Sequence, residues 1–209
     1  MTDAKQSKIQ RKNRRRIMNA ALDIFSTYGY RGSTIEQIAQ AAEMSKSSVF
    51  YYFPSKTDIY VALLSETLKE WLAPLTQLDP KGDPAQEIWA YVERKLDLSR
   101  SHPRQSRLFA NEILHGAPNI MDILQGELKD LIDEKCLVIQ RWIDQGKLAK
   151  ISPYHLIFMI WASTQHYADF EVQVTTLIGD DRDQNFDDAR QTLQTMFLNG
   201  LLNPLQNQH

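Results

Sequence analysis

The chain has 209 residues, of which 43% are hydrophobic, and its formal net charge is −2. This length allows one large domain or a small domain followed by a larger one, with enough apolar side chains for a packed core. The single cysteine, Cys136, excludes an intrachain disulfide. The longest apolar run, residues 156–162, is too short to span a bilayer, and no apolar segment of the secretory type follows the charged N-terminus. A cytoplasmic protein is therefore expected.

Basic residues are concentrated at the N-terminal end of the chain. Residues 1–56 contain 10 Lys and Arg against 4 Asp and Glu, whereas residues 57–209 contain 14 and 22. A basic first quarter before an acidic remainder favours an N-terminal surface that binds a polyanion such as nucleic acid. The alternative is a solvated basic tail without a partner.

Apolar side chains recur with helical spacing along nearly the whole chain, and Gly and Pro fall at segment ends, which predicts an all-α fold. We expect an N-terminal three-helix helix-turn-helix DNA-binding domain, followed by a larger helical bundle for ligand binding and dimerisation. The expected helices cover about residues 11–28, a short segment capped at 33, 45–53, 55–78, 84–101, 103–116, 119–145, 153–170 and 185–202. A polar, acidic segment over 171–184 connects the last two.

Several of these boundaries follow from capping chemistry. Gly29 is expected to end the first helix as a C-cap. Ser33 is expected to cap the second helix, with Glu36 three residues later completing a capping box. Ser55 is expected to cap the fourth helix.

The segment from Ser45 to Tyr52 has the properties of a DNA-recognition helix. It is about 12 Å long at 1.5 Å per residue, which suits a major groove. Val49 and Phe53 are expected to anchor its inner face, with Phe50 adding to the packing. The outer face then carries hydroxyls, phenols and a lysine: Lys46, Ser47, Ser48, Tyr51 and Tyr52.

These residues are expected to divide between two kinds of DNA contact. Phosphate contacts position the protein and base-edge contacts select the sequence. Those expected at phosphates are Ser45, Tyr51, Tyr52 and Lys56, and those expected at base edges are Lys46, Ser47 and Ser48. The basic segment 8–16 is expected to add phosphate or minor-groove contacts. The alternative is an ordinary turn between packed helices, with half-buried tyrosines.

The segment from Ile17 to Leu64 resembles the N-terminal domain of the TetR family of bacterial transcriptional regulators. The residues that carry the resemblance are Ala21, Phe25, Gly29, Thr34, Ile38, Ala39, Ala42, Ser45, Tyr51, Phe53, Ser55 and Lys56. The resemblance implies an all-helical homodimer that binds palindromic operator DNA through its first three helices and a small effector through its larger domain. Thr34 is included among the expected DNA contacts.

Two residues depart from the family pattern. Glu43 replaces the usual glycine in the turn, and a non-glycine residue in a left-handed conformation costs about 1 kcal/mol. Phe50 replaces a common tyrosine, which removes one potential phosphate ligand.

The C-terminal part resembles the pyrimidine-responsive members of the family. The strings are WLAPL (71–75), SRLF (106–109), HGAP (115–118), LKDLIDEK (128–135) and HLIFMIWASTQHYADF (155–170). The resemblance implies that uracil or thymine releases the DNA and that the protein controls pyrimidine metabolism. Another effector, an amphipathic drug or a fatty acyl group, is the alternative.

The residues themselves are compatible with a small planar ligand. Trp161 and Gln165 are four residues apart and share one helical face, so an indole is available to stack on a ring and a carboxamide to pair with an imide edge. Trp71 is expected to add a second wall. The alternative is that both tryptophans are core packing and the amide is satisfied internally.

A dimer interface is expected from the last two long helices. One stripe comprises Phe186, Ala189, Leu193, Met196, Phe197, Gly200 and Leu201, and the other Met159, Ser163, His166, Tyr167 and Phe170. Two such helices from each subunit make a four-helix interface. Intrachain packing is the alternative.

No catalytic constellation is present, so an enzyme is not expected; a helical-bundle enzyme with a basic tail is the weaker alternative. Glu112 and His115 form half of a di-iron pattern without a second half, so no metal or other cofactor is expected. We expect residues 1–56 to form the DNA-binding domain with its basic tail and residues 57–209 the effector-binding and dimerisation domain.

Overall fold

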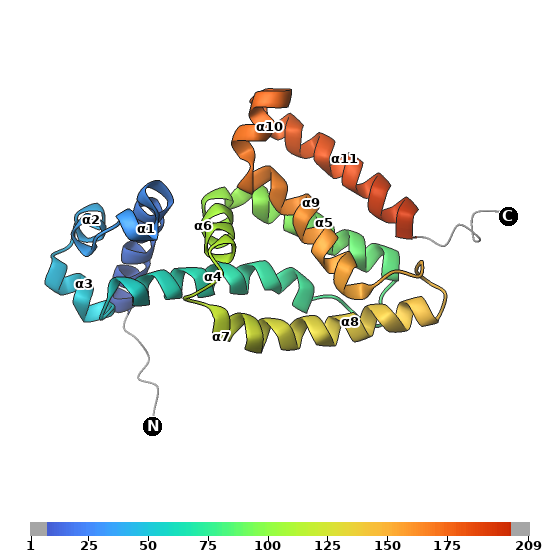
Figure 1. Cartoon of the computed structure of the whole chain (residues 1–209), viewed down its shortest axis with the longest axis horizontal. Helices are drawn as coiled ribbons and strands as arrows, with labels where there is room; N and C mark the ends of the chain where they lie inside the picture. The colour runs from blue at the N-terminus through green and yellow to red at the C-terminus, as the bar shows by residue number, and fades with distance from the viewer. Residues whose placement is uncertain (1–7, 202–209) are drawn as a thin grey trace. The chain divides into compact units, whose positions relative to one another are not determined.

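The computed structural model describes residues 8–201, and within that range it is all-helical without a β-strand, which confirms the expected fold class (Figure 1). The chain forms two compact units. Unit 1 holds the residues up to Leu68 together with Arg107–Ile120, and unit 2 holds Lys69–Ser106 together with the residues from Met121 onward. No helix within residues 8–201 is both long and apolar enough to cross a membrane.

Unit 1 contains the three N-terminal helices and parts of two others. These are α1 (Lys8–Gly32), α2 (Ile35–Ala41), α3 (Lys46–Tyr52), the first part of α4 (Lys56–Thr76) and most of α6 (Pro103–Leu114). Phe25, Ile38, Val49 and Ile59 are buried, one from each of α1 to α4. Each short helix is therefore held by one apolar face, which leaves the opposite face for other contacts.

Capping at the start of α2 differs from the expectation by one residue. Thr34, and not Ser33, is the N-cap: its Oγ1 accepts from the Gln37 backbone N–H at 3.2 Å, and the Gln37 side chain accepts from the Thr34 N–H at 2.8 Å. Ser33 is buried and donates its hydroxyl to the Gly29 carbonyl. Gly29 interrupts the first helix at the expected place, since its φ of 68° is not helical, but helical structure resumes beyond it and α1 ends at Gly32.

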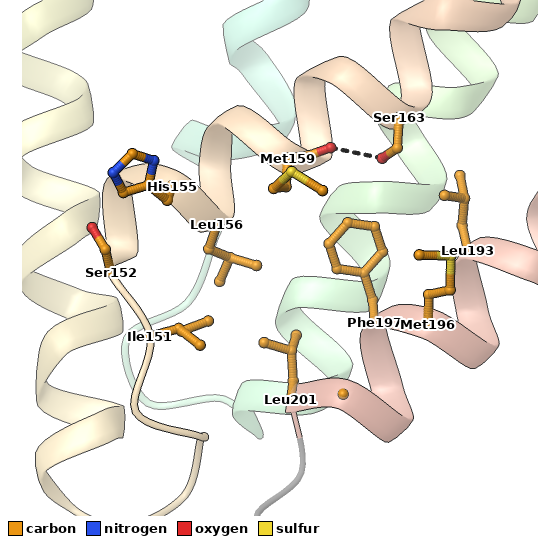
Figure 2. Close-up of a pocket in the computed structure, with 11 residues that line it drawn as sticks. Ile151, Ser152, His155, Leu156, Met159, Ser163, Leu193, Met196, Phe197 and Leu201 are labelled. Carbon is orange, nitrogen blue, oxygen red and sulfur yellow. Dashed lines mark hydrogen bonds between the residues drawn. The ribbon is translucent and has the colours of Figure 1, made fainter.

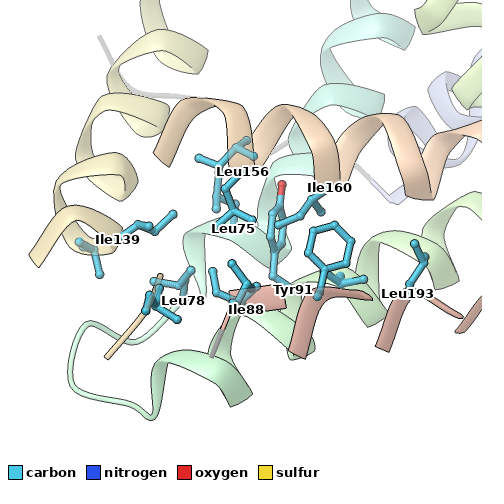
Figure 3. Packing of buried hydrophobic residues seen from close by; sticks show 14 of the residues in the cluster. Leu75, Leu78, Ile88, Tyr91, Ile139, Leu156, Ile160 and Leu193 are labelled. Carbon is cyan, nitrogen blue, oxygen red and sulfur yellow. The ribbon is translucent and has the colours of Figure 1, made fainter. Parts of the chain in front are cut away.

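Unit 2 is a bundle around one apolar core (Figure 3). It contains the end of α4 with α5 (Pro84–Ser101), α7 (Met121–Ile123), the π-helix η1 (Leu124–Leu128), α8 (Lys129–Asp144), α9 (Pro153–Asp169), α10 (Glu171–Ile178) and α11 (Arg182–Leu201). The core draws Leu75 from α4, Tyr91 from α5, Ile139 from α8, Ile160 from α9 and Leu193 from α11.

Two details of unit 2 differ from the expectation. The helix expected over 119–145 runs without a gap from Met121 to Asp144, but it contains the π-helical turn η1, in which Gly126, a poor helix former, lies. The connection expected over 171–184 contains α10, which ends at Gly179 with φ 94°. The acidic residues cluster after that glycine, near the N-terminus of α11, where negative charge stabilises a helix.

The two units are defined by packing, whereas the expected domain boundary between residues 56 and 57 concerns function. The unit boundary falls inside α4, between Leu68 and Lys69. The assignment of residues 1–56 and 57–209 to separate functions stays a prediction.

Candidate DNA-binding surface and effector site

The recognition helix α3 begins where the sequence predicts. Ser45 has an extended backbone, and its Oγ accepts from the Ser48 N–H at 3.1 Å, so it is the N-cap. Val49 and Phe53 are buried, which confirms the inner face. The prediction for Phe50 is wrong: 41% of this residue is exposed, because it is rotated about 100° from Val49 on the helix.

The outer face of α3 presents the expected polar groups in unit 1. Tyr51 is 72% exposed, Lys46 and Ser47 are exposed, and Ser48 and Tyr52 are half-buried. Thr34 is also exposed, at the start of α2. The structure thus presents these predicted residues to solvent, and their contacts with DNA stay predictions.

The start of α1 lies beside the two phenols. The amide of Gln10 donates to the Tyr51 hydroxyl at 3.4 Å, and that of Asn13 donates to the Tyr52 hydroxyl at 2.9 Å. The segment 8–16, treated as a basic tail in the sequence, therefore forms the first turns of α1. Its cations are consequently presented on a helix next to α3.

Lys56 has an internal role that its sequence position does not reveal. Its ammonium donates to the carbonyls of Tyr30 at 2.7 Å and Ser33 at 2.8 Å, and it lies 4.4 Å from the Tyr30 ring centroid. These contacts tie the start of α4 to the α1–α2 junction. Because two of its three N–H groups serve this tie, Lys56 has less capacity for a phosphate than expected.

Two ion pairs border the recognition surface. The Lys46 ammonium bonds the Glu36 carboxylate, and this hydrogen bond holds the Glu36 pKa below its usual value. Arg16 binds the carboxylate of Glu43, which has a left-handed φ of 48°. The turn therefore keeps the left-handed geometry although a glycine is absent. Since both pairs are exposed, they contribute little to stability.

Unit 2 contains the three residues expected around the effector. The Trp161 indole N–H donates to the Tyr91 hydroxyl at 2.6 Å, so α9 and α5 are joined at these residues. Trp71 is 6% exposed, and its indole nitrogen is buried without a hydrogen-bond partner. Gln165, one turn after Trp161, is half-buried, and no hydrogen bond of its carboxamide is found within residues 8–201.

Sequence reasoning missed Tyr91 and Lys95, which lie one turn apart on α5. Lys95 is 2% exposed, and its ammonium lies 3.7 Å from the Trp71 ring centroid. Burial holds the Lys95 pKa well below its usual value, although Asp169 partly opposes this shift. The available signal was a lysine inside the apolar stripe of a helix, where charged residues are seldom fully buried.

A separate apolar groove of about 320 Å³ lies between α9 and α11 (Figure 2). Met159 and Met196 line it from the two helices and are 57% and 61% exposed. The stripe expected on 185–202 is otherwise largely intrachain core, since these members are buried: Phe186, Ala189, Leu193, Phe197 and Leu201. By contrast, Met159 and His166 on α9 and Phe170, which caps its C-terminal end, are exposed.

Comparison with known proteins places both parts of the chain. Residues 17–63 match the family described as bacterial regulatory proteins, tetR family. Residues 64–204 match the family described as YcdC-like protein, C-terminal region. The HTH-type transcriptional regulator RutR of Escherichia coli K12 is 50% identical over 178 residues, which cover 85% of this chain and 84% of that protein.

More distant relatives share the fold. The transcriptional repressor NicS of Pseudomonas putida is 30% identical over half of each chain. A TetR-like transcriptional regulator from Rhodococcus sp. RHA1 superposes with a TM-score of 0.64 at 19% identity, covering 90% of this chain and 96% of that one. The fatty acid degradation regulator FadR from Bacillus halodurans has a TM-score of 0.65 at 18% identity, with 93% and 97% coverage.

Proposed function

The chain belongs to the TetR family of transcriptional regulators, and we propose that it is a repressor released from its operator by uracil or thymine. It is a DNA-binding regulator and not an enzyme, since its relatives regulate transcription. Family members bind operator DNA and small effectors, typically as dimers. What is proposed for this chain is the effector, the contacting residues and the interface.

The exposed face of α3 supports operator binding. Its hydroxyls and phenols surround a capped helix N-terminus, where backbone N–H groups and a partial positive charge favour a phosphate. The proposed phosphate contacts are Ser45, Tyr51, Tyr52 and Lys56, and the proposed base-edge contacts are Lys46, Ser47 and Ser48, with Thr34 beside them. Because Arg, Asn and Gln are absent from α3, DNA shape is proposed to carry part of the specificity.

The observation that carries the effector assignment is the 50% identity with RutR over 85% of this chain, taken together with the resemblance of the C-terminal strings to pyrimidine-responsive family members. The aromatic and amide side chains expected at the effector site in unit 2 also support this assignment. Trp71 and Trp161 supply aromatic surfaces, and the Gln165 carboxamide has one donor side and one acceptor side, as an imide edge has. A pyrimidine base presents the same pattern of alternating N–H and C=O groups.

The likeness to fatty acid regulators favours the second candidate, an acyl effector, less strongly. It rests on fold similarity at 18% identity, and a shared fold does not carry a shared ligand. A long acyl chain also requires an extended apolar site, whereas the Trp71 environment presents buried polar groups.

A homodimer is proposed through the exposed side of α9 and α11. The exposed residues on that side are Met159, His166, Phe170 and Met196. A second copy would cover these apolar groups, and two α3 helices in one dimer would reach two half-sites of a palindrome.

Release is proposed to act through α4. This one helix contributes Leu68 to unit 1 and Trp71 to unit 2, so an effector that contacts Trp71 binds beside a helix that continues toward the DNA-binding helices. The effector shifts the dimer from its operator-binding state only by the difference between its affinities for the two states.

Selection of bound fragments from a random DNA pool, followed by anisotropy titration of the selected duplex, tests the proposal. Operator affinity should fall at least about tenfold when uracil or thymine is added at saturating concentration, with adenine as the control base. If the protein binds the duplex and neither uracil nor thymine weakens that binding, the proposed effector is contradicted while the DNA-binding function stands.

A further inference from the structure

Two helices of unit 2 present polar side chains to each other in register. The hydrogen bond from Trp161 to the Tyr91 hydroxyl joins α9 to α5. Lys95 is one turn beyond Tyr91, and Gln165 is one turn beyond Trp161. Ser106, which follows α5 in the chain, donates to Asp169 at the end of α9, so the two helices advance in the same direction past this contact. Lys95 and Gln165 are therefore placed at the same level of the bundle.

Lys95 and Trp71 both carry donors that lack an acceptor. Within residues 8–201, the Lys95 ammonium rests on the face of the Trp71 ring at 3.7 Å from its centroid and forms no hydrogen bond. The Trp71 indole N–H is buried and unpaired. The Tyr91 hydroxyl, which accepts from Trp161, retains its own hydrogen for donation.

Unpaired polar groups in a protein interior are costly, and the burial that holds the Lys95 pKa well below its usual value reflects that cost. If the side chain at position 95 served only to pack against apolar neighbours, an uncharged residue would do so at lower cost than Lys95. The cluster is instead suited to a partner that supplies acceptor oxygens, because Asp169, whose charge acts on Lys95, accepts from the Ser106 hydroxyl and makes no hydrogen bond to Lys95 within residues 8–201.

We propose that Lys95 and the Trp71 indole N–H each bind an acceptor oxygen of the effector, Lys95 from the face of the indole ring and the N–H from its edge, and thereby restrict effectors to small planar rings bearing such oxygens. This inference rests on the proposed function and specifies the chemistry of that same site. Gln165 pairs with the adjacent N–H and C=O edge, and Trp161 provides ring surface. Ligands without an acceptor oxygen leave both donors unpaired and are rejected.

Calorimetric titration of the full-length protein with uracil tests the role of Lys95. Lys95→Met keeps the length of the side chain but removes the charge, and it should weaken uracil binding at least about tenfold. Lys147→Met, which removes an exposed lysine of unit 2, is the matched control and should bind as the original chain does. Thermal unfolding of each variant reports whether it is folded.

Two further measurements avoid any dependence on the folding of Lys95→Met. Trp71→Phe retains a ring beneath Lys95 but removes the indole N–H, and it should weaken uracil binding several-fold, roughly the effect of one lost hydrogen bond. 2-Thiouracil and 4-thiouracil each carry sulfur, a weaker acceptor, in place of one uracil oxygen, and both are titrated into the original chain. At least one of them should bind about tenfold less tightly than uracil.

The outcomes separate the two proposals. If the original chain binds uracil and both thiouracils equally tightly, or if folded Lys95→Met binds uracil unchanged, the role of Lys95 is overturned while the pyrimidine effector stands. If the original chain binds neither uracil nor thymine, the proposed function itself is overturned, and the role of Lys95 with it.

Discussion

At the scale of single residues, the DNA-binding surface contains a carboxylate that competes with DNA. Glu36 accepts a hydrogen bond from Lys46, the one cation on α3, and this bond holds the Glu36 pKa below its usual value. At neutral pH Glu36 is therefore ionised and occupies a cation that a phosphate or a base edge would use. The carboxylate also repels nearby phosphates.

Glu36→Gln should consequently strengthen operator binding. Removing one exposed charge beside the DNA is worth roughly a few-fold in affinity, and each additional phosphate contact steepens the salt dependence by about 0.9 in log–log slope. Anisotropy titrations between low and physiological salt measure both quantities. Glu127→Gln, an exposed position in η1, serves as the control. Weaker operator binding by Glu36→Gln would show instead that the ion pair positions Lys46 for its contact.

At the scale of elements, short helices depend on their caps. α2 and α3 have seven residues each, too few to be stable without tertiary packing and termini that are satisfied. Thr34 performs this function for α2 through a reciprocal bond pair with Gln37. Ser45 performs it for α3 through the Ser48 N–H.

Thr34→Ala should therefore lower the free energy of unfolding by about 1 kcal/mol, the usual cost of losing an N-cap side chain. Thr34→Ser keeps a hydroxyl at the same place and should recover most of that loss. Urea denaturation followed by circular dichroism provides the comparison. Equal stability of the alanine and serine variants would mean that Ser33 or solvent replaces the cap.

At the scale of the whole molecule, the exposed apolar side of α9 and α11 is proposed to join two copies. Met159 and Met196 are more than half exposed although they border the apolar groove of about 320 Å³. A surface of this kind, next to a helix pair, is characteristic of an association site.

Met196→Glu should produce a monomer that no longer binds the operator tightly, because the symmetric interface would bury two unpaired carboxylates. Sedimentation velocity at about micromolar concentration measures the association state. Leu137→Glu, which places the same charge at an exposed position of α8, should remain dimeric. A Met196→Glu protein that sediments as a dimer would move the interface elsewhere.

Local pattern in the sequence was sufficient for the helical class, for most helix boundaries and for the buried anchors Val49 and Phe53 of the recognition helix, although it misplaced Phe50. Periodicity and capping act over a few residues, so they can be recognised in the sequence without a structure. The same locality explains the errors. Ser33 and Thr34 are both acceptable caps in isolation, and only the buried position of Ser33 decided between them.

The proposed effector site depends on contacts between residues that are distant in sequence. The sequence by itself determined that Trp161 and Gln165 share a face, and resemblance pointed to a pyrimidine. Only the tertiary structure placed Tyr91 against Trp161, 70 residues away, and Lys95 on the ring of Trp71. The physical reason is that the role of a charged residue inside an apolar stripe depends on the groups that surround it in the folded chain. Packing removes water from Lys95, and that desolvation lowers its pKa and leaves its N–H groups without solvent as a partner.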